Sequence, residues 1–196
     1  MGEIKSAAEI AREKIEKLGE VTEEERLKWK YVPEGEKLAA RYIKETCNLV
    51  NELNKYEEKA RQYVTAGISD ILVRNINLPK NDIAQKTNKK AMEGLKAVKT
   101  DKIAVENVFS KIRRVLDHYL QQGEQQKKQA YESLKAEFAA RIQQAIQQQI
   151  GVNAQLKIDV ERQPQFQEEW QKLQSQLDSQ YLNLLDEYKQ ELSAID

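Results

Sequence analysis

Apolar residues recur every three or four positions through most of this 196-residue chain, which is the spacing of one face of an α-helix. Between residues 34 and 78 the pattern predicts one long helix or two collinear helices, and Pro79 ends the run. Asn48, Asn51 and Asn54 mark the place where a break is expected. Asparagine caps a new helix better than it extends an old one.

Two shorter helices are predicted over residues 82–98 and 102–120, each preceded by a side chain that suits a helix N-terminus. Residues 121–129 carry no apolar side chain, so this stretch is predicted to be a solvated bridge or a hinge whose backbone can stay helical. The helical spacing resumes over residues 131–149. Gly151 is expected to end that helix, because glycine tolerates the left-handed conformation of a helix C-terminus.

The last predicted helix begins at Pro164, since proline suits the first turn of a helix, and its apolar residues keep a period of about 3.6. Its length allows it to run antiparallel along residues 121–149. The pattern therefore predicts a helical hairpin, with Trp170 packing near residues 142–146 and Tyr188 near the bridge without apolar residues.

The first 33 residues are predicted to form a segmented arm. Ser6 and Thr22 each start a capping-box pattern, which opens a helix, and Pro33 is expected to interrupt the second of these helices. The first helix is short and has an apolar stripe that needs something to cover it. The candidate partner-docking residues are those of the stripe: Ile4, Ala8, Ala11, Ile15 and Leu18.

Residues 152–160 alternate apolar and polar side chains, which is a strand-like pattern. A lone strand needs a partner edge, so the segment is either an extended connector or a small pairing with another chain. The predicted fold is an all-α, elongated helical bundle. Its expected parts are an N-terminal helical arm (1–33), a helical body (34–120) and a hairpin extension (121–196).

The composition supports this fold and narrows the classes of partner. Charged residues make up 33% of the chain and there are only 3 Pro and 7 Gly, which is typical of long helices. The 32 basic and 32 acidic residues cancel, so no overall field attracts nucleic acid or an anionic membrane. Without a membrane-spanning run or an apolar signal-peptide core, the protein is expected to be cytoplasmic and to have no membrane partner.

Few residues suggest catalysis or metal binding. His118 is the only histidine and Cys47 the only cysteine, which excludes a two-histidine metal site, a multi-cysteine zinc site and an intrachain disulfide. The scattered glycines form no phosphate-binding loop and no nucleophile elbow. We therefore expect no enzyme activity and no cofactor.

Lysines concentrate between residues 80 and 102, where they could bind phosphate groups as point charges. A solvated helix face is the stronger interpretation, because lysine rather than arginine dominates and no aromatic residue interleaves. The candidate anion-binding residues are Lys86, Lys89, Lys90, Lys96 and Lys99.

Four places in the chain carry a family resemblance: residues 1–7 (MGEIKSA), 75–79 (NINLP), 93–95 (EGL), and the tail, with QLDSQY at 176–181 followed by KQEL at 189–192. At these places the chain resembles a bacterial family described only as a domain of unknown function. The resemblance implies a bacterial, cytoplasmic protein and indicates no activity, catalytic residue or cofactor.

The sequence thus predicts a non-enzymatic helical interaction or scaffold protein whose arm or hairpin docks onto a protein partner or a second copy of the chain. Self-association as a homo-oligomer stays open. The alternative is a nucleic-acid- or anion-binding module that uses the lysines of residues 80–102, although nucleic acid is the less favoured partner. A third option is an enzyme whose site is assembled between subunits.

Overall fold

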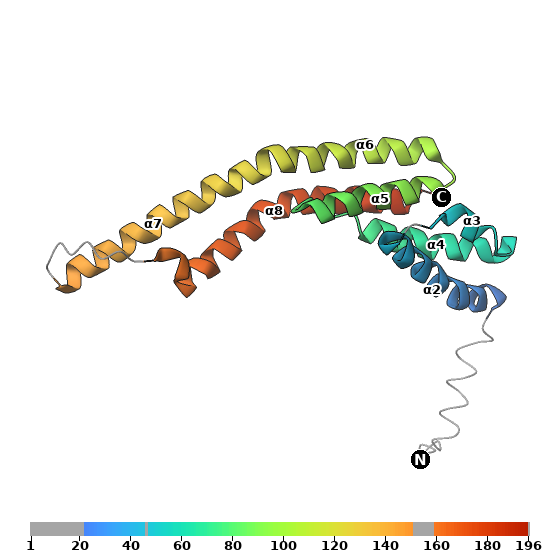
Figure 1. The fold of residues 1–196 in the computed structure, drawn as a ribbon, viewed down its shortest axis with the longest axis horizontal. Helices are drawn as coiled ribbons and strands as arrows, with labels where there is room; N and C mark the ends of the chain where they lie inside the picture. Colours follow the sequence, from blue (N-terminus) through green and yellow to red (C-terminus); the bar gives the residue numbers. More distant parts are fainter. Residues whose placement is uncertain (1–21, 46, 151–158, 196) are drawn as a thin grey trace, which may run out of the picture.

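The computed structural model describes residues 22–45, 47–150 and 159–195, and all their side chains except those of 149 and 150. Figure 1 shows an elongated molecule in which a helical body at one end continues into a long helical hairpin at the other. Every regular element in these ranges is a helix, so the predicted all-α class is confirmed. The predicted docking residues at positions 4–18 lie outside the described residues.

Helix α2 (Glu23–Lys44) starts with the predicted capping box: the backbone N–H of Glu25 donates to the Thr22 hydroxyl (3.2 Å), and the backbone N–H of Thr22 donates to the Glu25 carboxylate (2.9 Å). The helix continues through Pro33, so the predicted interruption is wrong. Proline costs the helix one hydrogen bond, but α2 packs against α4 on both sides of this residue. The predicted arm boundary at residue 33 thus falls inside a helix of the body.

The chain reverses after α2. The side chain of Asn48 accepts a hydrogen bond from the backbone N–H of Asn51 (3.1 Å) and caps the short helix α3 (Leu49–Leu53). Helix α4 (Glu58–Arg74) then runs parallel to α2 and beside it (Figure 1). The break predicted at the asparagines is confirmed. The prediction of one long helix or two collinear helices is wrong, because apolar periodicity does not show whether a chain reverses direction.

Helices α2 and α4 approach so closely that their backbones touch at two glycines. A Cβ atom at Gly35 would lie 2.1 Å from the carbonyl oxygen of Val64, and one at Gly67 would lie 2.2 Å from that of Val32. Only glycine leaves room for this crossing.

Helices α5 (Asp82–Val98) and α6 (Lys102–His118) closely match the two predicted shorter helices. Asn81 caps α5 by accepting from the backbone N–H of Ala84 (2.8 Å), and Asp101 caps α6 in the same way. Helices α2 to α6 share one core with the last turns of α8. Its buried apolar residues include Leu38, Val64, Ile68, Leu72, Leu95, Val105, Phe109, Ile112, Leu185 and Leu192.

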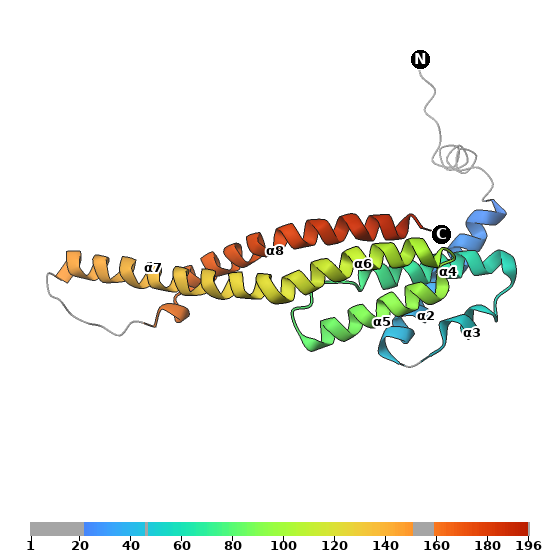
Figure 2. The same cartoon turned by 90° about the horizontal axis from the view of Figure 1, so that it is seen from above.

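The rod of the hairpin is continuous. A π-helical turn, η1 (Tyr119–Gly123), joins α6 to α7 (Glu124–Ile150), so the predicted bridge without apolar residues is helical. After η2, a 3-10 turn (Val160–Arg162), α8 (Pro164–Ser193) returns antiparallel to α7 and α6 (Figure 2). The predicted hairpin is confirmed.

The register of the hairpin differs from the prediction. The Trp170 ring packs against Tyr131, with 5.0 Å between ring centroids, rather than centring on residues 142–146. Tyr188 lies beside Lys111 of α6, whose Nζ is 5.6 Å from the ring centroid, and so lies beyond the predicted bridge.

The shift arises because η2, which precedes α8, packs beside the middle of α7 rather than at its end. Lys135 of α7 pairs with Glu161 of η2 (2.5 Å), so α8 begins beside the middle of α7. Most of the predicted strand-like segment, residues 152–158, lies outside the described residues, and Val160 belongs to the 3-10 turn.

The hairpin has a small core of its own, separate from that of the body. Aromatic rings dominate it and meet edge to face at centroid distances of 5.0 to 5.6 Å, a favourable geometry. The buried members are Leu134, Phe138, Val160 and Phe166, with Tyr131, Ile142, Trp170 and Leu173 half-buried around them.

Candidate functional site

A groove of about 430 Å³ lies between α5 and α6, and we call it the α5–α6 groove. Its volume is within the range of small-ligand and peptide sites. Asn88 of α5 holds one end of it: its side chain accepts from the backbone N–H of Asn77 (2.9 Å) and donates to the carbonyl of the same residue (2.6 Å). The apolar residues along the groove are Pro79, Met92, Phe109, Leu116 and Leu120.

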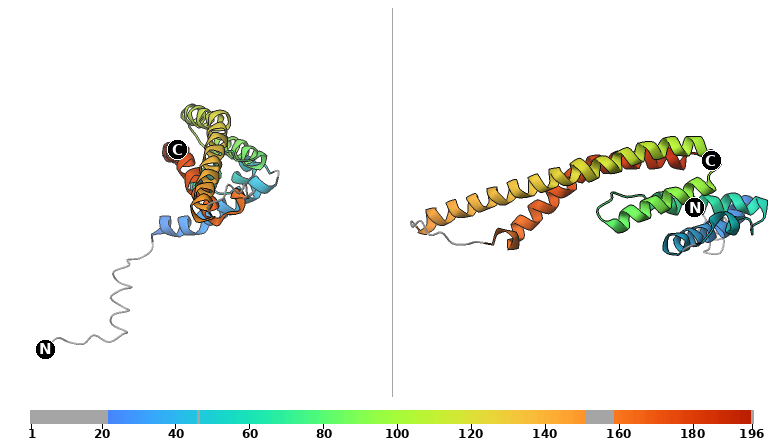
Figure 3. Two further views of the ribbon diagram at one scale, coloured as in Figure 1. Left: turned by 90° about the vertical axis from the view of Figure 1, so that its left-hand side faces the viewer. Right: turned by 45° about the horizontal axis from the view of Figure 1, so that its top comes forward.

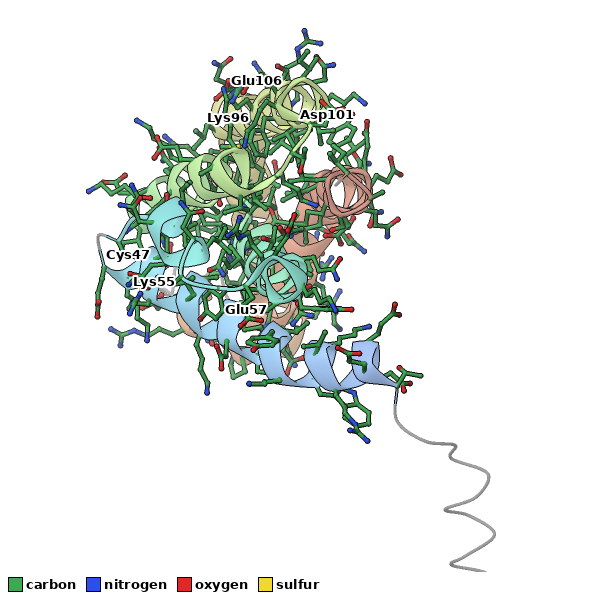
Figure 4. The ribbon with its side chains drawn as sticks, turned by 90° about the vertical axis from the view of Figure 1, so that its right-hand side faces the viewer. Cys47, Lys55, Glu57, Lys96, Asp101 and Glu106 are labelled. Carbon is green, nitrogen blue, oxygen red and sulfur yellow. The ribbon has the colours of Figure 1, made fainter. Side chains whose placement is uncertain are left out.

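Charges of both signs form the rim of the α5–α6 groove. Glu106 of α6 pairs with Lys96 of α5 (2.8 Å) and with Arg113, two turns further along α6. Hydrogen bonds from Lys96 and then from Arg113 hold the pKa of Glu106 below its usual range. Figure 4 shows Lys96 and Glu106 close together on the outer side of the body. Lys89, Glu93 and Asp117 complete the charged rim.

The structure separates the five predicted anion-binding lysines. Lys90 donates to the carbonyls of Ile43 (3.2 Å) and Glu45 (2.8 Å), where it covers the C-terminus of α2. Lys99 is buried and donates to the carbonyl of Ile195. Lys96 is in the ion pair of the groove rim, so of the five lysines only Lys86 and Lys89, both exposed, form no hydrogen bond or ion pair within the described residues.

A buried polar cluster that the sequence interpretation missed lies at the base of the hairpin. The carboxylate of Asp178 on α8 pairs with Lys127 of α7 (2.9 Å) and with Lys80 from the α4–α5 connection (2.7 Å). The Tyr119 hydroxyl of η1 donates to the same carboxylate (3.1 Å) and accepts from Lys127. The side chains of Asp178 and Lys127 are only 4% and 9% exposed, so this cluster joins body and hairpin through buried charge.

Electrostatics keep both buried charges ionised. Burial works to raise the pKa of Asp178, but hydrogen bonds and attraction from Lys80 and Lys127 outweigh it and hold that pKa below its usual range. Burial works to lower the pKa of Lys127, but hydrogen bonds to Tyr119 and Asp178 raise it well above its ordinary value. Burial also raises the pKa of the Tyr119 hydroxyl.

The remaining chemical candidates have structural neighbours. The Nδ1 atom of His118 lies 3.0 Å from the Tyr181 hydroxyl, beside the buried cluster. Cys47 is half-buried in the turn between α2 and α3. Among the described residues, no group of three or more His, Cys, Asp or Glu side chains is placed to hold a metal ion.

A second, wider groove of about 880 Å³ runs along α4 towards the end of α8. Its walls are largely polar, and two of its residues, Arg61 and Ser69, each have a buried polar atom without a hydrogen-bond partner. Those atoms are closed off from the groove by their burial, so they offer no contact to a ligand. The α5–α6 groove therefore remains the better candidate site.

A family model matches residues 50–194, about three quarters of the chain, and is described as a family of unknown function (DUF6657). The chain belongs to this family, which agrees with the predicted resemblance to a domain of unknown function. No curated protein and no solved structure matches it. Across the residues that the structure describes, no helix is long and apolar enough to span a membrane.

Proposed function

We propose that this member of DUF6657 is a non-enzymatic helical interaction protein whose α7–α8 hairpin binds a protein partner. The main support for this proposal is that the hairpin protrudes from the body. Figure 3, right, shows α7 and the first turns of α8 running on past the ends of α4 and α5. Because the hairpin has its own aromatic core, it can hold its shape while its outer faces contact another molecule.

The surface of the hairpin favours protein over nucleic acid. Lys135 is paired with Glu161 (2.5 Å). Arg141 is paired with Glu137 (2.5 Å) and Glu169 (3.6 Å). The positive charge of these two side chains is therefore largely neutralised. Uncharged amides fill much of the surface between them, and an amide both donates and accepts hydrogen bonds. The exposed glutamines of α7 are Gln125, Gln126, Gln129, Gln143, Gln144, Gln147 and Gln148.

The lysines of residues 80–102 give less support to a nucleic-acid function. Three of the five candidates contact groups of the protein itself, as described above for Lys90, Lys96 and Lys99. Phosphate binding by counterion release needs several free basic groups along one surface. Nucleic acid is therefore an outcome to be tested rather than a second proposal.

The test is affinity capture of the tagged full chain from its native lysate, with and without nuclease, followed by quantitative mass spectrometry. Wild type is compared with a hairpin variant, Gln144→Glu with Gln148→Glu. The matched control makes the same chemical change at exposed positions away from the protruding part of the hairpin, Gln62→Glu on α4 with Gln190→Glu in the last turn of α8.

We expect one protein partner in near-stoichiometric amount that survives nuclease, falls at least tenfold with the hairpin variant and stays unchanged with the control. Equal recovery by wild type and the hairpin variant would show that the hairpin is not the binding surface. Loss of every co-purifying species on nuclease treatment would instead point to nucleic acid.

A further inference from the structure

The dimensions of the α5–α6 groove suit an α-helix. One edge of the groove runs along α6 into η1, from Glu106 to Leu120, and the other runs along α5, from Gln85 to Lys96. At a rise of 1.5 Å per residue these edges are about 21 and 16 Å long. A groove of this length with apolar residues along it accepts an amphipathic helix through residues spaced i, i+3/4, i+7.

The rim of the groove sets a condition on the charge of its occupant. Lys89, Lys96 and Arg113 are balanced by Glu93, Glu106 and Asp117. A purely acidic or purely basic helix would meet like charge on half of this rim. An occupant with both signs beside an apolar stripe would meet opposite charges.

Residues 4–18 of this chain have these properties. Ile4 and Leu18, the ends of the stripe, are 14 positions apart, so as a helix the stripe would be about 21 Å long. The small residues Ala8 and Ala11 in the middle of the stripe would let its backbone lie close to the walls of the groove. Both signs of charge flank it, at Glu9, Arg12, Glu13, Lys14, Glu16 and Lys17.

The start of α2 lies on the side of the body away from α6, as Figures 1 and 4 show. Only residues 19–22 join the segment to α2, and four extended residues span at most about 14 Å. A tether this short favours a groove on another molecule over the segment's own.

We propose that the α5–α6 groove binds residues 4–18 of a second copy of the chain. The exchange is reciprocal, so each copy gives one segment and receives one, and the product is a closed twofold dimer. This self-association is separate from partner binding by the hairpin, since the groove and the glutamines of the hairpin surface share no residue.

The test measures the mass of the full chain in solution over a range of concentrations by light scattering and analytical ultracentrifugation. The groove variant is Leu120→Glu, because this side chain is already 36% exposed and can take a charge without unfolding the core. The segment variant is Ile15→Glu. The matched control is Ile83→Glu, at an α5 residue that is 77% exposed and outside the groove.

We expect a dimer for wild type and for Ile83→Glu, and at least a tenfold weaker dimer for Leu120→Glu and for Ile15→Glu. Circular dichroism checks that all four proteins keep the same helix content. A wild type that is monomeric at every concentration would overturn the proposal. So would a dimer that neither Leu120→Glu nor Ile15→Glu weakens.

Disulfide trapping identifies the occupant. In a Cys47→Ser background, a chain with Leu120→Cys is mixed with a differently tagged chain with Ile15→Cys. Cross-linking between the two tags supports the exchange. If a single chain carrying both cysteines links only to itself, the segment occupies its own groove and the dimer proposal is wrong. The hairpin variant Gln144→Glu with Gln148→Glu should leave the dimer intact, so the two proposals can fail separately.

Discussion

Substituting Gly67 by alanine tests the closest contact in the body. The added methyl carbon would lie 2.2 Å from the carbonyl oxygen of Val32 and 3.1 Å from the backbone nitrogen of Glu36. Ordinary van der Waals contact begins at 3.4 Å, so a gap of 1.2 Å would have to open between α2 and α4. Both neighbours are backbone atoms, which cannot rotate away as the end of a side chain can.

The magnitude follows from two opposing effects. Overpacking of a core costs about 1–3 kcal/mol, and rigid backbone neighbours put Gly67→Ala at the upper end of that range. Alanine favours the helix by about 1 kcal/mol over glycine. The expected net loss is about 2 kcal/mol of unfolding free energy, which lowers Tm by about 4–8 °C in a chain of this length.

Thermal and urea unfolding of the full chain, followed by far-UV circular dichroism, measures this loss. Gly94→Ala on α5 is the control, because its added methyl would meet the ends of the Tyr42 and Leu72 side chains at 2.7 and 2.8 Å, and these can move. Its loss should be clearly smaller. If Gly67→Ala is as stable as wild type, the close parallel packing of α2 and α4 is wrong.

The other predictions concern the hairpin and its base. Asp178→Asn leaves Lys127 buried beside a neutral amide and should cost about 3 kcal/mol of unfolding free energy, whereas the exposed control Asp186→Asn should cost almost nothing in the same urea titration. The lowered pKa of Asp178 means that its stabilising charge is fully present above its unfolded value near 4 and is lost as pH falls through the folded value. Wild-type stability should therefore fall more steeply below about pH 4 than that of Asp178→Asn, and parallel curves would contradict this. Trp170→Ala should raise amide hydrogen exchange in the first turns of α8 and leave α5 unchanged, because the ring packs only in the hairpin core.

Helix positions could largely be predicted from local signals. Caps at Asn81 and Asp101 and the proline at residue 164 mark helix starts that the structure has at the expected residues. The end of α7 at Ile150, just before Gly151, follows from the same kind of signal. Such signals act over a few residues, so they remain readable without knowledge of the fold.

Long-range arrangement could not be predicted in the same way. The side-by-side packing of α2 and α4 depends on a backbone contact at Gly35 and Gly67, residues 32 positions apart in the sequence. The continuation of α2 through Pro33 depends on the same contact, because tertiary packing offsets the lost hydrogen bond. The register of α8 depends on where η2 packs along α7, at Lys135, which periodicity does not record.

The two candidate sites also differ in whether the sequence could predict them. The buried cluster had a readable signal: Lys127 continues the helical spacing of Tyr131 and Leu134 backwards, and Asp178 lies between Leu177 and Tyr181 on the apolar stripe of its helix. A charge of each sign at core positions of two antiparallel helices indicates an ion pair. The groove had no comparable signal, because it forms only where α5 and α6 come together.

The most direct test of the interaction function is site-specific photo-crosslinking in the native cell. A photoreactive amino acid replaces Gln144, an exposed residue of the hairpin, or Lys86, an exposed residue of the body. We expect a heavier cross-linked species at residue 144 that contains a different protein and resists nuclease, and no such species at residue 86. Cross-linking at residue 86 alone, or at neither position, would contradict a partner-binding hairpin.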